Sequence, residues 1–379
     1  MAEKKCPPCR LNSVGGQAVI EGVMMKNGTR VALAVRKEDG SVEINNSEFH
    51  PLKEKHKWLN IPVLRGIVGF IESMVLSVKT LNTSTNMLGL DELEEKERAE
   101  KQAKKERKRL EKQAKKQGVS YEELAKTTED VAVKEEKTEK KSKNSSSTGI
   151  IMVLSLIFGF ALAMFLFMAL PTMATDGINY LVTKYTDFNG INHYLQAGIE
   201  GVIKILIFIV YIASVSFMKD IRRTFAYHGA EHKSIACYEK GLELTPENAR
   251  KCSRFHPRCG TSFLFVMLII SIIVGMFIPE FDSMPWLRVV CKIATLPLIM
   301  GIGYEFIMLA GKHNNWFTRM LSAPGLWMQR LTTKEPNEHQ LAIAICAIKA
   351  TMPEEFPGFD LEGYRISHEE NREHIMYEA

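Results

Sequence analysis

Two histidines and a glutamate lie close together near the middle of the chain, in the order His228, Glu231 and His232. Residues four apart share one face of a helix, so both imidazoles would point the same way, with Glu231 on nearly the same face. This H-x-x-E-H order is that of the inverted zincins, in which two imidazoles hold a divalent metal, usually zinc, and the carboxylate is a general base toward water. The alternative is a surface helix whose polar residues lie at a membrane interface.

A catalytic zinc site needs a third protein ligand and an open position for water. The first candidate is Glu305, which lies about one helical turn from the end of an apolar stretch, where a carboxylate is costly unless it faces a partner. The alternative is that Glu305 reaches toward the membrane interface and binds nothing. Cys259 and His256 are the next candidate ligands, because both directly precede another apolar stretch.

Three further charged residues are candidates for substrate binding. Arg254 and Arg258 suit an anionic substrate or a lipid headgroup, although such charges also anchor the cytoplasmic side of membrane proteins. Glu21 is flanked by apolar residues and needs a partner if it is buried. It follows Gly15 and Gly16, a pair that allows unusual backbone angles or the close approach of another group.

The composition excludes some classes of protein. The chain has 379 residues, and its formal net charge of +5 is small for that length, so no specific nucleic-acid partner is expected. Its seven cysteines follow no regular framework, which indicates a reducing compartment. Cys6 and Cys9 enclose two prolines and predict a disordered tail rather than a redox motif.

Four apolar stretches predict membrane spans, and membrane lipids are therefore expected partners. The fold class is expected to be mainly α, a polytopic membrane protein with about four transmembrane helices. Lysines and arginines gather in alternate segments between the spans, which predicts that both termini and the His228 motif are cytoplasmic. The predicted membrane domain covers residues 149–310, with spans at 149–170, 199–218, 262–278 and 289–310 and a loop at 219–261 that carries the H-x-x-E-H motif.

The N-terminal part predicts two further units. Residues 1–58 form a cytoplasmic segment in which a glycine-rich stretch precedes a β-hairpin around a turn at 38–41. Residues 59–90 predict an amphipathic or membrane-associated helix, which lies in the membrane interface or packs on other helices. The reason is one stripe of three charges, each seven residues after the last: Arg65, Glu72 and Lys79.

The remaining segments are polar. Residues 91–148 are almost wholly charged or polar, which predicts a solvated helix followed by a disordered linker. This linker offers a surface to a membrane-protein or cytoplasmic protein partner. Residues 311–379 form a C-terminal cytoplasmic segment, in which residues 338–349 have the spacing of a helix with one packing face.

Several blocks of the chain outside residues 91–148 form a recognisable set. They are the stretch from Gly15 to Met25, His228-Gly-Ala-Glu-His-Lys, His256-Pro-Arg-Cys-Gly-Thr-Ser, the Glu305 region, Pro324-Gly-Leu-Trp, and Leu331-Thr-Thr-Lys-Glu-Pro. In this order the blocks resemble the YqhQ-like family. The resemblance implies a multi-pass protein of the bacterial cytoplasmic (inner) membrane with a metal-dependent activity, and it implies no substrate.

The residues favour a membrane-embedded hydrolase that uses a divalent metal, with zinc expected first. In this hypothesis His228 and His232 bind the metal, Glu305 or Cys259 completes the site, and Glu231 activates water. Peptide bonds near the membrane are the first substrate class, by analogy with other membrane metalloproteases, and lipid-linked esters are the second. The alternative is a non-enzymatic scaffold or regulatory protein with a structural metal or polar cluster, which would not need Glu231. Transport ranks last, because few charges line a path through the spans.

Overall fold

The computed structural model describes residues 13–37, 39–89, 154, 157–186, 191–279, 285–312 and 316–359. The chain forms two compact units, residues 1–88 with 167–379 and residues 89–166. The predicted linker at 91–148 and the Cys6 and Cys9 tail lie outside the described residues. The fold described below is that of the first unit.

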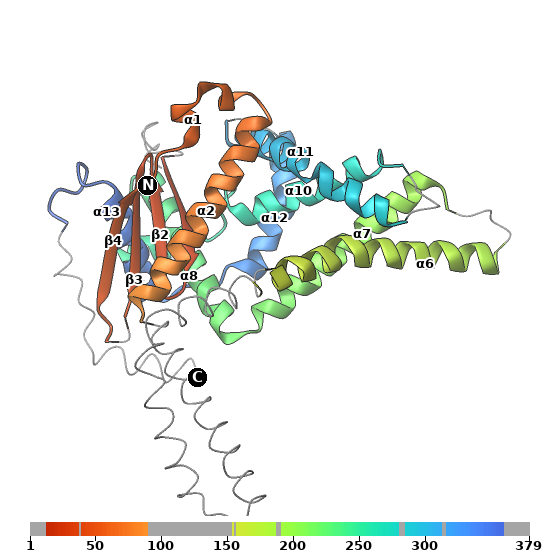
Figure 1. The fold of residues 1–379 in the computed structure, drawn as a ribbon. Coiled ribbons are helices and arrows are strands. Elements are labelled where there is room, and N and C mark those ends of the chain that lie inside the picture. The colour runs from red at the N-terminus through yellow and green to blue at the C-terminus, as the bar shows by residue number, and fades with distance from the viewer. Residues whose placement is uncertain are drawn as a thin grey trace, which may run out of the picture. The chain divides into compact units, whose positions relative to one another are not determined.

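An antiparallel sheet occupies the N-terminal segment (Figure 1). Its strands follow one another in chain order: β1 (Val14–Val19), β2 (Gly22–Asn27), β3 (Arg30–Arg36) and β4 (Val42–Glu48). The predicted hairpin is the β3 and β4 pair, and Gly40 takes a φ of 83° in its turn. The glycine-rich stretch, by contrast, forms β1 and β2, which glycine's low strand propensity did not indicate.

Helices cover both faces of the sheet. On one face Val23 and Ala34 belong to a buried core shared with α8 (Lys219–Glu239), α9 (Pro246–Arg250) and α13 (Glu338–Thr351). On the other face Met24 and Leu33 pack with a side chain of α2 (Leu64–Met87). Alternate residues therefore point to opposite cores, and a strand buried on both faces is apolar without alternation, as β3 is from Val31 to Val35.

Within the described residues, three helices have the length and composition of membrane spans, which indicates a membrane protein. They are Ile157–Tyr185, whose second part is α6 (Leu170–Tyr185), α7 (His193–Ser216), and Trp286–Phe306 within α11 (Pro285–Lys312). A fourth apolar helix, α10 (Gly260–Gly275), has 16 residues. It is about 24 Å long, shorter than the roughly 30 Å hydrocarbon core. Three of the four predicted spans thus correspond to helices of sufficient length.

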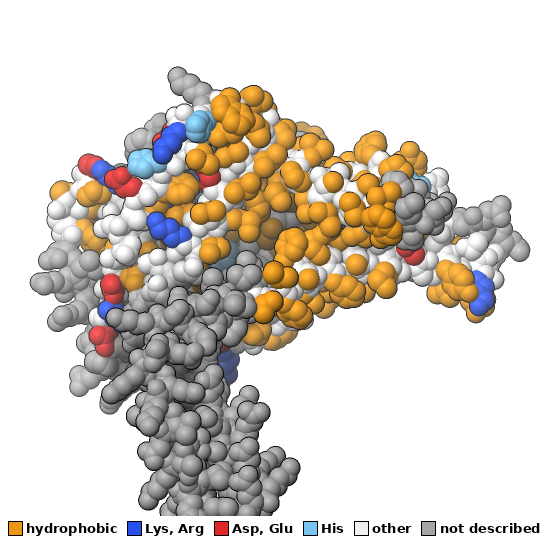
Figure 2. Space-filling view, viewed as in Figure 1, with side chains coloured by type: hydrophobic (Ala, Val, Ile, Leu, Met, Phe, Trp, Pro, Cys, Tyr) orange, Lys and Arg blue, Asp and Glu red, His pale blue; other side chains and the backbone are white. Residues whose placement is uncertain are grey.

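The amphipathic helix α2 has its apolar side on the outside. Ile71, Val75 and Val78 are each more than half exposed, and apolar side chains continue over the neighbouring helices (Figure 2). The opposite side of α2 is close to α11, because a Cβ on Gly66 would lie 3.1 Å from the Cα of Gly301. Small residues at such a crossing are typical of helices that pack within membranes.

Short elements complete the first unit. They are α1 (Leu52–Lys55), a 3-10 turn (Lys57–Asn60), a π-helical turn (Phe165–Ala169) that overlaps the boundary of the two units, and α12 (Trp316–Thr332). Helix α12 packs against α10, where a Cβ on Gly325 would lie 2.7 Å from the Cα of Ser262. This contact brings the end of α12 to the start of α10, next to α8.

Candidate metal centre

The H-x-x-E-H motif lies in the middle of α8, which is buried from Gly229 to Ile235. The tightest contact is at Gly229, where a Cβ would lie 2.0 Å from the carbonyl oxygen of Lys334. The backbone amide of Lys334 donates a 2.8 Å hydrogen bond to the carbonyl oxygen of Phe225, which holds this segment against the helix. The glycine inside the motif therefore lets the end of α12 reach the histidines.

Three potential metal ligands converge at this point. One ligand atom each of His228, His232 and Cys259 lies within 4.8 Å of the others. The Nε2 of His228 is 3.1 Å from the Sγ of Cys259, and the two imidazole centroids are 4.4 Å apart. Two imidazoles and a thiolate match the three protein ligands of a catalytic zinc site, with one position left open, and sulfur favours zinc over harder cations.

Backbone carbonyl groups orient both imidazoles. The Nδ1 of His228 lies 2.9 Å from the carbonyl oxygen of Thr332, and the Nδ1 of His232 lies 2.6 Å from that of Arg254. A carbonyl accepts only, so each Nδ1 must carry the hydrogen, and the lone pair of Nε2 is free for a metal. Burial lowers the pKa of His232, although Cys259 and the Arg254 carbonyl oppose this effect. The neutral imidazole, the form that binds metals, is thereby favoured.

Gln329 fixes the loop that carries Cys259. This fully buried side chain accepts a 2.8 Å hydrogen bond from the backbone amide of His256 and donates a 2.7 Å bond to the carbonyl oxygen of the same residue. Its amide nitrogen also lies 3.0 Å from the hydroxyl oxygen of Ser262. Cys259 itself is the N-cap residue of α10, a position at which the helix dipole favours negative charge.

Glu231 is a buried carboxyl group on the wall of a large cavity. The cavity measures about 800 Å³ and is lined by α2, β1, α8 and the start of α10, including His228, His232 and Cys259. Burial raises the pKa of Glu231 to about 7, against an opposing effect of His228. A Cβ on Gly16 would lie only 2.8 Å from the Cγ of Glu231, so β1 leaves room for this side chain because it has glycine there.

The other predicted site residues have different positions. His256 and Arg258 line the same cavity, and both contact the carboxylate of Glu239. The side chain of Arg254 lies 3.7 Å from Glu335, and only its carbonyl group belongs to the cluster.

Glu21 and Glu305 also have partners outside the cluster. Glu21 has a φ of 53° in the turn between β1 and β2, where it binds Arg223 of α8. Glu305, predicted as the first candidate for the third ligand, accepts hydrogen bonds of 2.7 and 2.5 Å from Arg65. The structure therefore brings Cys259, rather than Glu305, to the two histidines. Glu305 instead joins α11 to the start of α2.

Comparison with known proteins identifies the family. The model of the family described as "Protein of unknown function (DUF1385)" matches residues 61–354. The uncharacterized protein YqhQ of Bacillus subtilis (strain 168) is 34% identical over 354 residues, which cover 91% of this chain and 92% of that protein. This chain belongs to the YqhQ-like family. No solved structure matches it.

Two positioning residues of this YqhQ-like protein, Gln329 and Thr332, were not found from the sequence. Gln329 and Thr332 lie on α12 and act through hydrogen bonds to backbone and imidazole groups, which no local spacing reveals. Gly16 was noted as a position for close approach, and the group that approaches it is Glu231.

The close contact at Gly229 gives a direct test of how this YqhQ-like protein positions His228. Gly229→Ala should separate α8 from the end of α12, because the new methyl group would overlap the Lys334 carbonyl oxygen. Overpacking of this kind costs about 1–3 kcal/mol, and misplacing the carbonyl that orients a metal-binding imidazole weakens metal binding by about 10–100-fold. Zinc titration and thermal unfolding in detergent would measure both effects.

The matched control is Gly198→Ala in α7. A Cβ on Gly198 meets no atom within 4 Å, so the same substitution there should leave zinc affinity and the unfolding temperature nearly unchanged. If the two variants had equal zinc affinities and equal unfolding temperatures, that result would contradict the role assigned to Gly229.

Proposed function

We propose that this YqhQ-like protein is a metal-dependent hydrolase of the membrane, with zinc held by His228, His232 and Cys259. The observation that carries the proposal is the convergence of these three side chains on one wall of a large cavity, beside the buried carboxyl group of Glu231. The Nδ1 contacts of both imidazoles favour the tautomer in which Nε2 is the metal-binding atom. Ligands that are already oriented by hydrogen bonds suit a resident metal better than the ligands of a surface cluster would.

Each group in the cavity has a proposed role. Zinc, when bound, supplies a Lewis acid that polarises the scissile carbonyl group and makes water more acidic. Glu231 accepts the proton of the attacking water and returns it to the leaving group. A carboxyl group whose pKa is about 7 is well suited to both steps near neutral pH. Gly16 of β1 has no side chain and therefore leaves room for the carboxyl group of Glu231. The Thr332 and Arg254 carbonyl groups hold the imidazoles in place.

The cavity lining favours a substrate that enters from the membrane. Lys26 of β2 and Arg258 line it and would attract an anionic group of the substrate. Burial lowers the pKa of Lys26, because it disfavours the charged ammonium group. An anionic group of the substrate would stabilise that ammonium group. Helix α2, whose outer face is apolar, forms another wall. A peptide bond in a membrane-proximal segment is the proposed substrate class, and a lipid-linked ester is the second.

The same reasoning gives a proposed topology. We place α2 in the membrane interface, because its exposed side is apolar while Arg65 near its start binds Glu305 of α11. The short helix α10 is proposed as a fourth span, reached by local thinning of the bilayer. The basic residues at the start of α8 and throughout the polar segments support a proposed orientation in which the metal centre and both termini lie on the cytoplasmic side of a bacterial inner membrane.

Zinc-dependent hydrolysis is the test of the function. Purified protein loaded with zinc would be assayed in vesicles against two substrate classes, peptides with a membrane-proximal cleavage segment and fluorogenic lipid esters. Hydrolysis of one class is expected, with loss on adding EDTA and recovery on adding zinc. Stoichiometric zinc binding without hydrolysis of either class would overturn the hydrolase and favour the alternative described next.

The alternative is a structural metal site in a membrane scaffold or regulatory protein. The hydrogen bonds of Gln329 favour it, since they already tie the Cys259 loop to α12, and a metal would add α8 to the same unit. In that case residues 91–148 would carry the surface for a membrane-protein or cytoplasmic partner. Binding of the partner would then depend on residues 91–148 and would survive the loss of Glu231.

A further inference from the structure

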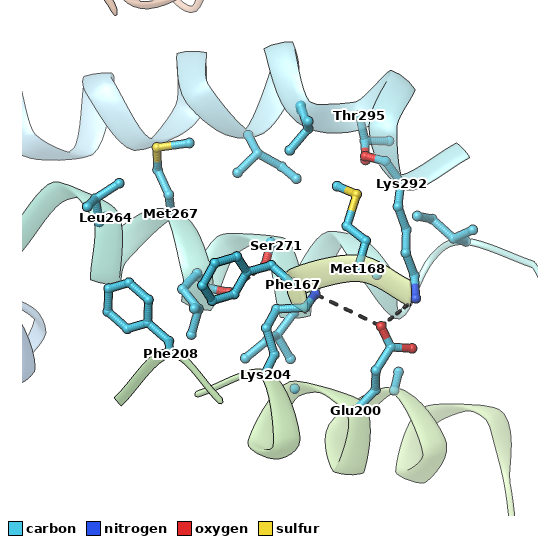
Figure 3. Close-up of a pocket in the computed structure, with 18 of the residues that line it drawn as sticks. Phe167, Met168, Glu200, Lys204, Phe208, Leu264, Met267, Ser271, Lys292 and Thr295 are labelled. Atoms are coloured by element: carbon cyan, nitrogen blue, oxygen red, sulfur yellow. Dashed lines mark hydrogen bonds and ion pairs between the residues drawn. The ribbon is translucent and has the colours of Figure 1, made fainter. Parts of the chain in front are cut away.

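A second cavity lies among the membrane helices, and Leu264 lines both this cavity and the one at the metal centre. It measures about 410 Å³ and is lined by α7, α10, α11 and the π-helical turn that precedes α6 (Figure 3). Most of its lining is apolar or aromatic, including Phe167, Phe208 and Met267. The volume is within the range of small-ligand sites, which is about 300–1,000 Å³. The cavity is therefore large enough to hold part of an amphiphile.

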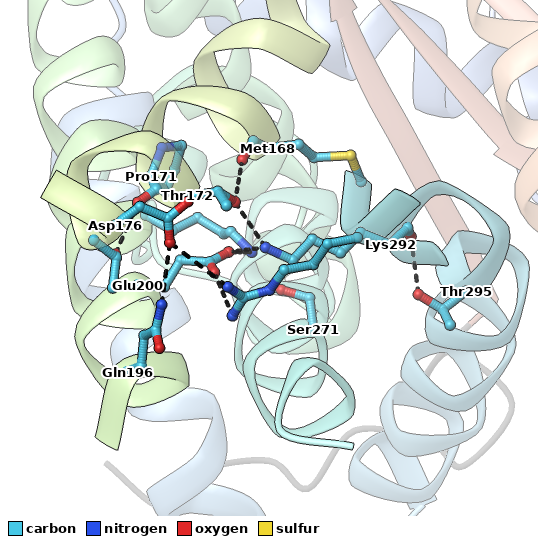
Figure 4. A network of polar contacts seen from close by, with 12 residues as sticks. Met168, Pro171, Thr172, Asp176, Gln196, Glu200, Ser271, Lys292 and Thr295 are labelled. Atoms are coloured by element: carbon cyan, nitrogen blue, oxygen red, sulfur yellow. Dashed lines mark hydrogen bonds and ion pairs between the residues drawn. The ribbon is translucent and has the colours of Figure 1, made fainter. Parts of the chain in front are cut away.

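Charged side chains form one end of this cavity (Figure 4). Glu200 of α7 is the centre of the group, and it pairs with Lys292, with Arg288 at 3.4 Å and with Lys204 at 4.0 Å. Arg288 also lies 3.8 Å from Asp176. Among the described residues, three cations thus meet two carboxylates, which leaves one excess positive charge in this group. An uncompensated charge among membrane helices is costly and marks a functional site by default.

Two of these cations have spare hydrogen-bonding groups. The side chain of Lys204 is 13% exposed, and its contact with Glu200 at 4.0 Å is longer than a hydrogen bond. Within the described part of the chain, the Nε of Arg288 is buried without a hydrogen-bond acceptor. Lys292, by contrast, also donates to the hydroxyl of Thr172 at 2.8 Å. Within the described residues, Lys204 therefore presents to an apolar cavity an ammonium group whose one carboxylate partner, Glu200, it shares with Lys292 and Arg288.

We propose that this cavity binds one anionic amphiphile of the membrane. Its head group would lie on Lys204 and Lys292, and its acyl chain would lie along the apolar wall toward Leu264. The excess positive charge matches one negative head group, and the aromatic and aliphatic lining matches a hydrocarbon chain. The shared chemistry belongs both to a free fatty acid and to a phospholipid with an anionic head. This proposal does not rest on the proposed hydrolase.

Native mass spectrometry of the full chain in detergent would test the binding. The protein would be mixed in turn with palmitate, phosphatidylglycerol or phosphatidylcholine. One bound molecule is expected with palmitate or with phosphatidylglycerol, and the stronger of the two identifies the source. Lys204→Gln should weaken this binding by about 10–100-fold, the range for losing a hydrogen bond to a charged group. The control Lys184→Gln removes a lysine that stacks on Tyr180 and should bind as wild type does.

Two results would overturn the proposal. One is equal retention of phosphatidylcholine and of the anionic amphiphiles, and the other is unchanged binding by a folded Lys204→Gln variant. Wild type alone offers a second test that does not depend on folding of the variant, a series of fatty acids of increasing length. Affinity should rise with each added methylene until the cavity is filled. No dependence on chain length would exclude the apolar wall as the binding surface.

Discussion

Replacing His228 and His232 by alanine should reduce the bound metal from about one ion per chain to less than about a tenth of that. The reason is that two of the three converging ligands are lost, and the single thiol of Cys259 that remains forms no chelate. Elemental analysis of the detergent-purified variant beside wild type would measure the change. Size-exclusion chromatography would show whether the variant is folded.

Two control variants make this result specific. Glu305→Gln should keep its metal, because the carboxylate of Glu305 is bound to Arg65 and lies outside the cluster. His256→Ala should also keep it, since its imidazole faces Glu239 although it lines the same cavity. Loss of metal from Glu305→Gln together with retention by the double variant would show that the ligand set is wrong.

Glu231→Gln should lower the rate of zinc-dependent hydrolysis by about 10²–10⁴-fold, the usual contribution of a general base. The amide has nearly the same shape as the carboxyl group but cannot accept the proton of water. Zinc content should be unchanged, because Glu231 is outside the group of three ligands. Full activity in the glutamine variant would eliminate the role of general base. Glu338→Gln, at an exposed glutamate paired with Arg250, is the matched control and should keep wild-type activity.

The same variant should be at least as stable as the wild type. Burial raises the pKa of Glu231 from 4.5 to about 7, so the folded state opposes ionisation of this group. The contribution of the protonated carboxyl group to the free energy of unfolding is fully present below pH 4.5 and is lost as the pH rises to about 7. Glutamine carries no charge, so the unfolding temperature of metal-free variant should exceed that of metal-free wild type increasingly across this pH range. Such a trade of stability for activity is typical of catalytic groups.

Local spacing was enough to predict some parts of the site. The apolar stretches predicted the long membrane helices, and the four-residue spacing of His228 and His232 predicted that both would face the same way. The stripe of Arg65, Glu72 and Lys79 was also visible, because helical periodicity is a property of neighbouring residues. The partner that the stripe contacts could not be predicted, since Arg65 binds Glu305, which is 240 positions away in the chain.

The third ligand shows the limit most clearly. Glu305 was preferred because a carboxylate in an apolar helix needs a partner, and that physical argument holds, yet the partner is an arginine. Cys259 reaches the histidines only because a loop turns back and Gln329 fixes it from α12, 70 residues further along the chain. The strands β1 and β2 were missed for a related reason, because pairing and burial on two faces outweighed the low propensity of glycine.

The order in which the ribosome makes this chain has a consequence for the sheet. Its strands end at Glu48, but α13, which covers one face, does not begin until Glu338. At about 5–20 residues per second, the interval between them is roughly 15 to 60 seconds. During that time the membrane helices can insert, while Val23, Met25 and Ala34 have no helix α13 to cover them. The core that the sheet shares with α8 and α13 can therefore form completely only after the membrane helices have inserted. Until then the nascent sheet is exposed to aggregation.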